Sequence, residues 1–219
     1  MSLEARKIRL LMQLRSAGIS DTPTLAAIER VPRELFAPPS FHDQAYENIA
    51  LPIGNDQTLS QPEVVALMTE ALAVNKRHTI LEIGTGSGYQ AAILSHLARR
   101  VYTIERHREL LREAESRFKE LRLTNLVTRL GDGGRGWPEK RTFDRIIVTC
   151  AAELPPEPLL EQLAPDGLIV LPVGAPNRTQ VLVRLTKTAD GLKREELAQV
   201  RFVPLVSTPP GQIGRRSAG

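Results

Sequence analysis

Short apolar stretches alternate with amphipathic ones between residues 78 and 174, and this alternation limits the possible folds more than any other feature. The predicted strands cover 78–83, 100–105, 126–131, 144–150 and 167–174, and the predicted helices cover 89–98, 108–121 and 156–164. Strands that alternate with helices are typical of a parallel sheet with helices on both faces. Continuous apolar runs such as IIV and LIVL are expected of strands buried on both faces.

Two further strands are predicted near the end of the chain, at 179–187 and 195–205. Asp190 and Gly191 lie between them, and this turn signal favours an antiparallel pair at one edge of the sheet. The prediction is therefore an α/β fold with a doubly wound, mostly parallel seven-stranded sheet and an antiparallel edge. A chain of 219 residues is long enough for one such domain.

The first 56 residues predict a helical extension packed on this core. Helices are expected over 3–18, where Gly18 ends the pattern, and from Asp21 to just before Pro32. Residues 33–56 carry three prolines and no periodicity, so we expect an irregular arm. The predicted division is an extension at 1–56, a core at 57–208 and a flexible tail at 209–219.

Composition favours a cytoplasmic protein that binds neither membranes nor nucleic acid. The formal charge is +4, but basic residues are mostly interleaved with acids, as in ERHRELLREAESRFKE, which is typical of a solvated helix face. We find no apolar run long enough to cross a bilayer and no secretory signal. The only cysteine, Cys150, lies in an apolar run, where we expect a buried, inert thiol.

The segment LEIGTGSGYQAAIL at 81–94 predicts a strand that enters a glycine-rich turn and then a helix. Glycines allow unusual backbone angles and let a ligand approach closely. The spacing is GxGxG, whereas dinucleotide-binding proteins carry GxGxxG. The loop therefore favours S-adenosylmethionine over NAD.

Acidic residues lie at the ends of the next two strands. Glu105 lies about 20 residues beyond the first glycine, where a carboxylate can accept hydrogen bonds from ribose hydroxyls. Asp132, beside Gly133, would accept the exocyclic amine of adenine. The alternatives are that Glu105 pairs with Arg106 or Arg108, and that Asp132 is an ordinary turn residue.

Several segments match one family in order: VPRELF, ALPIGNDQTLSQPEVVALMTEAL, LEIGTGSGYQAAIL, GDGGRGW, FDRIIVTCAAE and RFVPLV. Together they resemble the protein-L-isoaspartate O-methyltransferases over roughly residues 5 to 206. The resemblance implies a Rossmann-like methyltransferase fold and the transfer of a methyl group from S-adenosyl-L-methionine to the α-carboxylate of L-isoaspartyl residues, with D-aspartyl residues as secondary substrates. The sequence departs from the family at Asn55 and Asp56, where smaller residues or glycine are common.

Such an acceptor is already an anion at neutral pH, because the pKa of a carboxyl group is about 4, and it needs no general base. None of the four histidines falls in a catalytic pattern, and no residue cluster has metal-ligand spacing. We therefore expect no metal. Thr58 and Ser60 are the candidates for holding the acceptor. Ser60 also begins a capping box with Glu63 for the helix that follows, and a pure capping role is the alternative.

The residues predicted to bind the cofactor lie in the first segment of the core and at three strand ends: Gln57, Thr58, Ser60, Glu82, Gly84, Thr85, Gly86, Ser87, Glu105, Asp132 and Gly133. We expect a monomer that acts on isoaspartyl-containing proteins and peptides. Two other functions stay open: a methyltransferase for a small molecule or RNA, and a noncatalytic binding module on the same fold.

Overall fold

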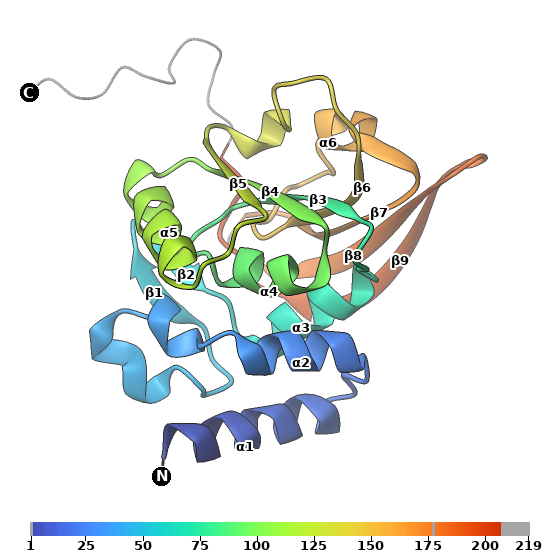
Figure 1. Cartoon of the computed structure of the whole chain (residues 1–219). Coiled ribbons are helices and arrows are strands. Elements are labelled where there is room, and N and C mark those ends of the chain that lie inside the picture. The colour runs from blue at the N-terminus through green and yellow to red at the C-terminus, as the bar shows by residue number, and fades with distance from the viewer. Residues whose placement is uncertain (1, 177, 207–219) are drawn as a thin grey trace, which may run out of the picture.

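A computed structural model describes residues 2–176 and 178–206. Its main sheet has the strand order β5-β4-β3-β6-β7-β8-β9 (Figure 1). The strands are β3 (Thr79–Ile83), β4 (Arg100–Glu105), β5 (Leu126–Leu130), β6 (Phe143–Val148), β7 (Leu163–Val173), β8 (Gln180–Thr188) and β9 (Gly191–Val200). The pairs from β5 to β7 are parallel, and β8 pairs antiparallel with both neighbours. The predicted fold class and antiparallel edge are confirmed.

Helices cover both faces of this sheet. They are α1 (Leu3–Ser16), α2 (Thr22–Arg30), α3 (Pro62–Ala71), α4 (Tyr89–Leu97), α5 (Arg108–Glu120) and α6 (Glu157–Glu161). Successive strand residues point to opposite faces. Accordingly Ile80 and Ile147 pack with α3 and α4, whereas Leu81 and Ile146 pack in a second cluster with Trp137 and α6.

The N-terminal part packs on the core without a cluster of its own. Buried side chains of α1 and α2, such as Leu14 and Ile28, share one hydrophobic cluster with α4 and α5. In Figure 1, α2 lies next to the core and α1 lies outside it. The arm is less irregular than expected, because it contains two 3-10 helices, η1 (Arg33–Phe36) and η2 (Pro39–Gln44).

A two-stranded hairpin, which the sequence did not predict, joins the arm to the core. It pairs β1 (Leu51–Gly54) with β2 (Gln57–Leu59). Its turn residues, Asn55 and Asp56, have φ values of 51° and 56°. Two positive φ angles define the turn that suits a hairpin best, and Asn and Asp tolerate this conformation better than other side chains. The departure at these two positions therefore still permits the turn. The proposed boundary between residues 56 and 57 falls at its end.

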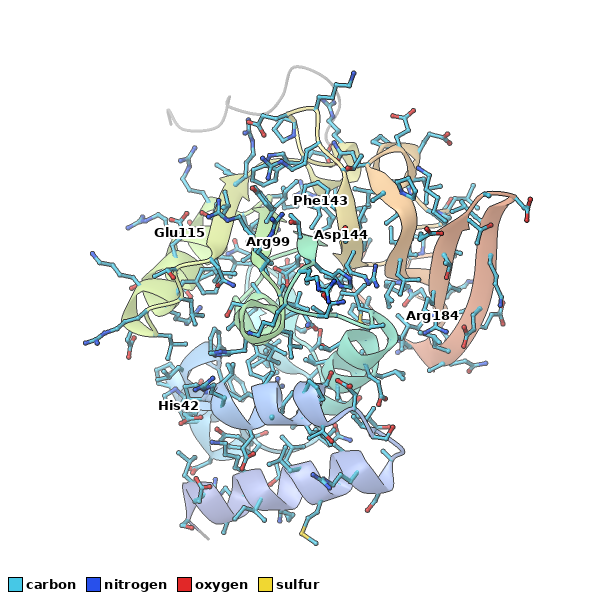
Figure 2. The ribbon with its side chains drawn as sticks, turned by 45° about the vertical axis from the view of Figure 1, so that its right-hand side comes forward. His42, Arg99, Glu115, Phe143, Asp144 and Arg184 are labelled. Carbon is cyan, nitrogen blue, oxygen red and sulfur yellow. The ribbon has the colours of Figure 1, made fainter. Side chains whose placement is uncertain are left out.

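Polar contacts hold Thr79, the first residue of β3, at the amino end of the central strands. Asp144 accepts a hydrogen bond from the Thr79 N–H at 2.7 Å, and Arg99 donates to the Thr79 hydroxyl at 3.0 Å. Figure 2 shows Arg99 and Asp144 at this end of the sheet.

Across the described residues, no helix is both long and apolar enough to traverse a membrane. The proposed tail at 209–219 lies outside the described residues.

Candidate active site

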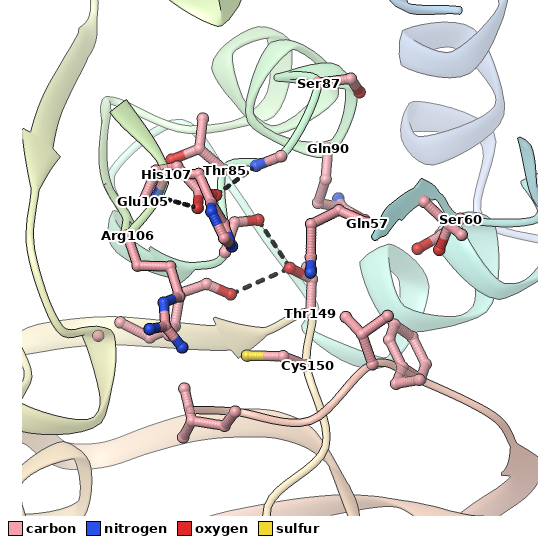
Figure 3. Close-up of a pocket in the computed structure, with 18 of the residues that line it drawn as sticks. Gln57, Ser60, Thr85, Ser87, Gln90, Glu105, Arg106, His107, Thr149 and Cys150 are labelled. Carbon is pink, nitrogen blue, oxygen red and sulfur yellow. Dashed lines mark hydrogen bonds between the residues drawn. The ribbon is translucent and has the colours of Figure 1, made fainter. Parts of the chain in front are cut away.

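A cavity opens at the carboxyl ends of β3, β4, β5 and β6. Its walls come from residues 57–60, 83–87, 104–107, 149–150 and 202–206, together with side chains of α3 and α4. In Figure 3, Gln57 and Ser60 lie on one side of the cavity, and Glu105, Arg106 and His107 lie on the other. Ligands of doubly wound sheets bind at this edge. The cavity therefore lies at the strand ends where the sequence predicted a ligand site.

Nine of the predicted site residues line this cavity: Gln57, Thr58, Ser60, Gly84, Thr85, Gly86, Ser87, Glu105 and Gly133. Two of these glycines are required by close contacts inside the protein. A Cβ at Gly84, where φ is +94°, would lie 2.5 Å from the Thr149 hydroxyl oxygen, and a Cβ at Gly133 would lie 2.3 Å from Ile83. Side chains at these positions would displace the loops that form the cavity wall.

Glu105 presents a carboxylate held by the backbone. One oxygen accepts from the Gly86 N–H at 2.9 Å, and the other accepts from the His107 N–H at 2.9 Å. A carboxylate has about four acceptor positions, so two donors leave capacity for a ligand. Among the described residues no salt bridge joins Glu105 to Arg106 or Arg108. This arrangement favours the ribose role over the alternative of a surface ion pair.

Glu82 lies beneath the loop and not in the cavity wall. Its side chain is fully buried and accepts a hydrogen bond from the Thr103 hydroxyl, which is 2.6 Å from the Thr85 hydroxyl. The pKa of Glu82 is raised to about 8, mainly by burial; the Thr103 hydrogen bond lowers it, and the nearby Glu105 charge contributes to the rise. Its other oxygen has no partner in the part of the chain that the structure describes. Glu82 can thus support Thr85 from below.

Asp132 also lies outside the cavity lining, although Gly131 and Gly133 on either side belong to it. Its carboxylate turns back to accept from the Gly134 N–H at 2.9 Å and lies 3.5 Å from Arg135. These contacts are those of a turn residue, the alternative raised from the sequence. The contact with adenine stays a prediction.

The predicted capping box of Ser60 and Glu63 is wrong. The N-cap of α3 is Gln61, and no side chain of that residue caps the helix. Instead Asn48, from the arm, accepts from the Glu63 N–H at 3.0 Å and donates to the Glu63 carboxylate at 2.6 Å. Asn48 therefore satisfies the groups that the sequence assigned to Ser60, and the Ser60 hydroxyl is available to a ligand.

Several residues that line the cavity were not predicted from the sequence. Thr149 and Cys150 follow β6, and the strand-end rule that located Glu105 would also have found them. Cys150 is buried as predicted, and burial raises the pKa of its thiol to about 12. His107, which falls in no catalytic pattern of the sequence, lines the wall beside Glu105.

The remaining wall comes from residues 202–206, after the last strand. Backbone hydrogen bonds between Ala151 and both Val203 and Leu205 hold this segment across the carboxyl edge. The sequence predicted residues 201–205 as the end of a strand at 195–205, whereas β9 ends at Val200. Within residues 2–176 and 178–206, no group of three His, Cys, Asp or Glu residues could hold a metal ion.

Comparisons with known proteins identify the family of the chain. The family model described as protein-L-isoaspartate(D-aspartate) O-methyltransferase matches residues 5–209. A protein-L-isoaspartate O-methyltransferase of Rhodospirillum centenum is 61% identical over 207 residues, covering 94% of each chain. One of Rhodospirillum rubrum is 61% identical over 212 residues, covering 96% of this chain and 97% of the relative.

Solved structures share the fold. A protein-L-isoaspartate O-methyltransferase superposes with a TM-score of 0.81 at 28% identity, covering 95% of this chain and 67% of that chain. A similar protein from Plasmodium falciparum, solved with S-adenosyl-L-homocysteine, gives a TM-score of 0.78 at 24% identity, covering 90% of this chain and 97% of that chain. Since the family match spans nearly the whole chain and the relatives are far above 30% identical, the chain belongs to the protein-L-isoaspartate(D-aspartate) O-methyltransferase family.

Proposed function

We propose that this chain methylates the α-carboxylate of L-isoaspartyl residues, and of D-aspartyl residues as secondary substrates, with Thr58 and Ser60 holding the acceptor. The ester then closes to a succinimide without help from the enzyme, which initiates repair of the damaged protein. One observation carries the assignment of the site: the Ser60 hydroxyl, which α3 does not use, and the Glu105 carboxylate line the same cavity.

The residues of the cavity fit S-adenosyl-L-methionine. Glu105 offers a carboxylate with acceptor positions left for ribose hydroxyls, and residues 84–87 bring backbone close to the ligand position. Ile83 and Ile104 provide apolar walls, and Gln57 and Ser87 add polar groups. Glu82 acts on the loop through Thr103, and Asp132 holds the neighbouring turn. When bound, this cofactor supplies an electrophilic methyl group on a sulfonium.

The chain's own task is then to bind and orient an anion that needs no deprotonation. The Ser60 hydroxyl would donate to one carboxylate oxygen, and Thr58 on the hairpin strand would assist. Residues 202–206 cover the opposite wall and reduce the access of water. Fixing two reactants in line contributes about 7 to 11 kcal/mol in well-oriented systems, so positioning alone can supply much of the catalysis.

A monomer acting in the cytoplasm, without nucleic acid or membrane partners, completes the proposal. The lone cysteine is buried, and the basic residues of α5 alternate with acids, as in the Arg117–Glu113 ion pair.

A labelling assay tests the function. The chain is incubated with methyl-labelled S-adenosyl-L-methionine and two peptides that differ only in isoaspartate or normal aspartate at one position. We expect base-labile label on the isoaspartyl peptide alone. Label on neither peptide, with cofactor binding confirmed by calorimetry, would favour a binding module. Transfer to RNA or to a small molecule would favour the other alternative.

A further inference from the structure

Arg33, in the arm, is fully buried and bonded to two distant parts of the chain. Its Nε donates to the Ala45 carbonyl at 2.7 Å, and its Nη2 donates to the Ser60 carbonyl at 2.8 Å. The second bond acts on the backbone of the proposed acceptor residue. Because a peptide unit is planar and trans, fixing the Ser60 carbonyl also fixes the direction of the next N–H. Arg33 therefore sets the orientation of the segment that holds the acceptor.

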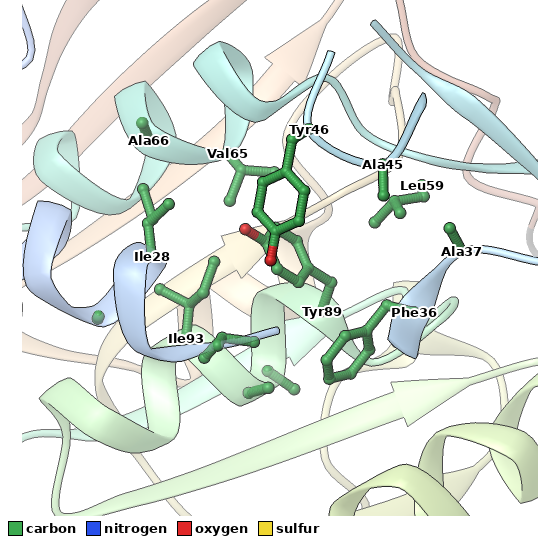
Figure 4. Close-up of a cluster of buried hydrophobic side chains, with 14 of the residues drawn as sticks. Ile28, Phe36, Ala37, Ala45, Tyr46, Leu59, Val65, Ala66, Tyr89 and Ile93 are labelled. Atoms are coloured by element: carbon green, nitrogen blue, oxygen red, sulfur yellow. The ribbon is translucent and has the colours of Figure 1, made fainter. Parts of the chain in front are cut away.

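The same side chain also contacts the cofactor side of the cavity. Its guanidinium carbon lies 4.7 Å from the ring centroid of Tyr89, the first residue of α4, and Tyr89 lines the cavity. Phe36 packs edge-on against this ring with centroids 5.5 Å apart, and Figure 4 shows Tyr89 among Phe36, Tyr46 and Val65. Arg33 thus connects the acceptor segment with the helix that follows the glycine loop.

The charge of Arg33 is not balanced by a carboxylate. No salt bridge includes it within the described ranges, and its Nη1 has no hydrogen-bond acceptor there. Burial lowers the pKa of Arg33, and the neighbouring Tyr89 opposes this shift. Burying a cation without a carboxylate partner lowers the stability of the folded state, and an apolar residue in the same space would lower it less. A buried charge that stability does not require points to a role in the site.

We propose that Arg33 is a positioning residue for the acceptor carboxylate. It fixes the backbone of Ser60 through the hydrogen bond from Nη2, and its unbalanced positive charge favours an anion beside the Ser60 hydroxyl. This inference rests on the proposed function, because it requires an anionic acceptor at Ser60. The competing explanation is that Arg33 only pins the arm to the core, in which case its loss would affect stability and all ligands alike.

The test compares Arg33→Met, Arg33→Lys and Arg33→Gln in the full chain. For Arg33→Met we expect the KM for the isoaspartyl peptide to rise at least about tenfold, because a charge-assisted interaction is lost. The dissociation constant for S-adenosyl-L-homocysteine should change less than about twofold. Lys and Gln each keep one donor nitrogen in place of the three of arginine, but they differ in charge. The Lys variant should recover a KM within about threefold of wild type, whereas the Gln variant should not.

Arg9→Met is the matched control. Arg9 also ties the arm, through an ion pair with Glu47, and its Nε is buried without a partner among the described residues, but it has no hydrogen bond to residues 57–61. The KM of the Arg9→Met variant for the peptide should stay within about twofold of wild type, because the substitution removes only an ion pair of the arm.

Three results would overturn the inference: an unchanged KM in all Arg33 variants, equal KM values for the Lys and Gln variants, or a parallel loss of cofactor and peptide binding. The Lys and Gln pair decides the matter even if Arg33→Met does not fold. Failure of the proposed function would differ from all of these, because the wild-type chain itself would then not label the isoaspartyl peptide.

Discussion

Replacing Ser60 by alanine separates the acceptor role from a structural one. A Ser N-cap contributes about 0.5–2 kcal/mol to stability, but the structure gives that role to Asn48 and not to Ser60. We therefore expect Ser60→Ala to change the free energy of unfolding by less than about 0.5 kcal/mol. A hydrogen bond from the hydroxyl to a charged carboxylate is worth about 1.5–3 kcal/mol. Its loss should lower kcat/KM for the isoaspartyl peptide by about 10- to 150-fold.

Asn48→Ala is the complementary variant. It removes both hydrogen bonds to Glu63, at 3.0 and 2.6 Å, and leaves the cavity lining intact. We expect a loss of about 1 kcal/mol in unfolding free energy, which corresponds to about 2–4 °C in Tm for a domain of this size. Denaturant unfolding and initial rates at saturating cofactor measure both quantities for both variants. A Ser60→Ala protein that loses 1 kcal/mol or more but keeps its kcat/KM would refute the reasoning.

Three further changes test other parts of the site. Glu105→Gln should raise the dissociation constant for S-adenosyl-L-homocysteine at least about tenfold in calorimetry, because a charged acceptor is lost, and an unchanged constant would exclude the ribose role. The folded-state pKa of Glu82, about 8, lies above its ordinary value of 4.5, so wild-type stability should fall between about pH 4.5 and pH 8, because the unfolded chain loses this proton there while the folded chain still holds it. Glu82→Gln should remove this decline in denaturant unfolding at pH 5 and pH 8, and parallel curves for the two proteins would contradict the shift. Asp56→Gly should raise stability by up to about 1 kcal/mol, because φ is positive there, whereas a loss would mean that the Asp56 side chain stabilises the turn.

The sheet was predictable because its signals are local and repeated. The strand at 100–105 was predicted at its exact bounds, and the antiparallel edge followed from two strands around Asp190 and Gly191. The predicted ends of elements were wrong where pairing with a strand remote in the sequence determines them. The helix predicted at 156–164 ends at Glu161, because Leu163 already pairs with Phe143 and begins β7.

The site was predictable where residues follow strand ends and less so where remote segments meet. Glu105 and the glycine loop follow consecutive strands, so one rule placed them in the cavity. Asn48 lies 15 residues before Glu63, and no local pattern shows that it replaces Ser60 as the cap. Arg33 reaches Ser60 across 27 residues through a bond that only the folded arm creates.

The closing wall of the cavity has a consequence for synthesis and truncation. Residues 202–206 follow β8 and β9 along the chain, and Val203 and Leu205 are bound to Ala151 at the carboxyl edge. A ribosome-bound chain that ends near Val200 would contain all seven strands of the sheet but only an open trough for its ligands. Enclosure of the methyl-transfer chamber thus requires synthesis to continue past the last strand, and it depends on five residues that lie outside the seven strands of the sheet.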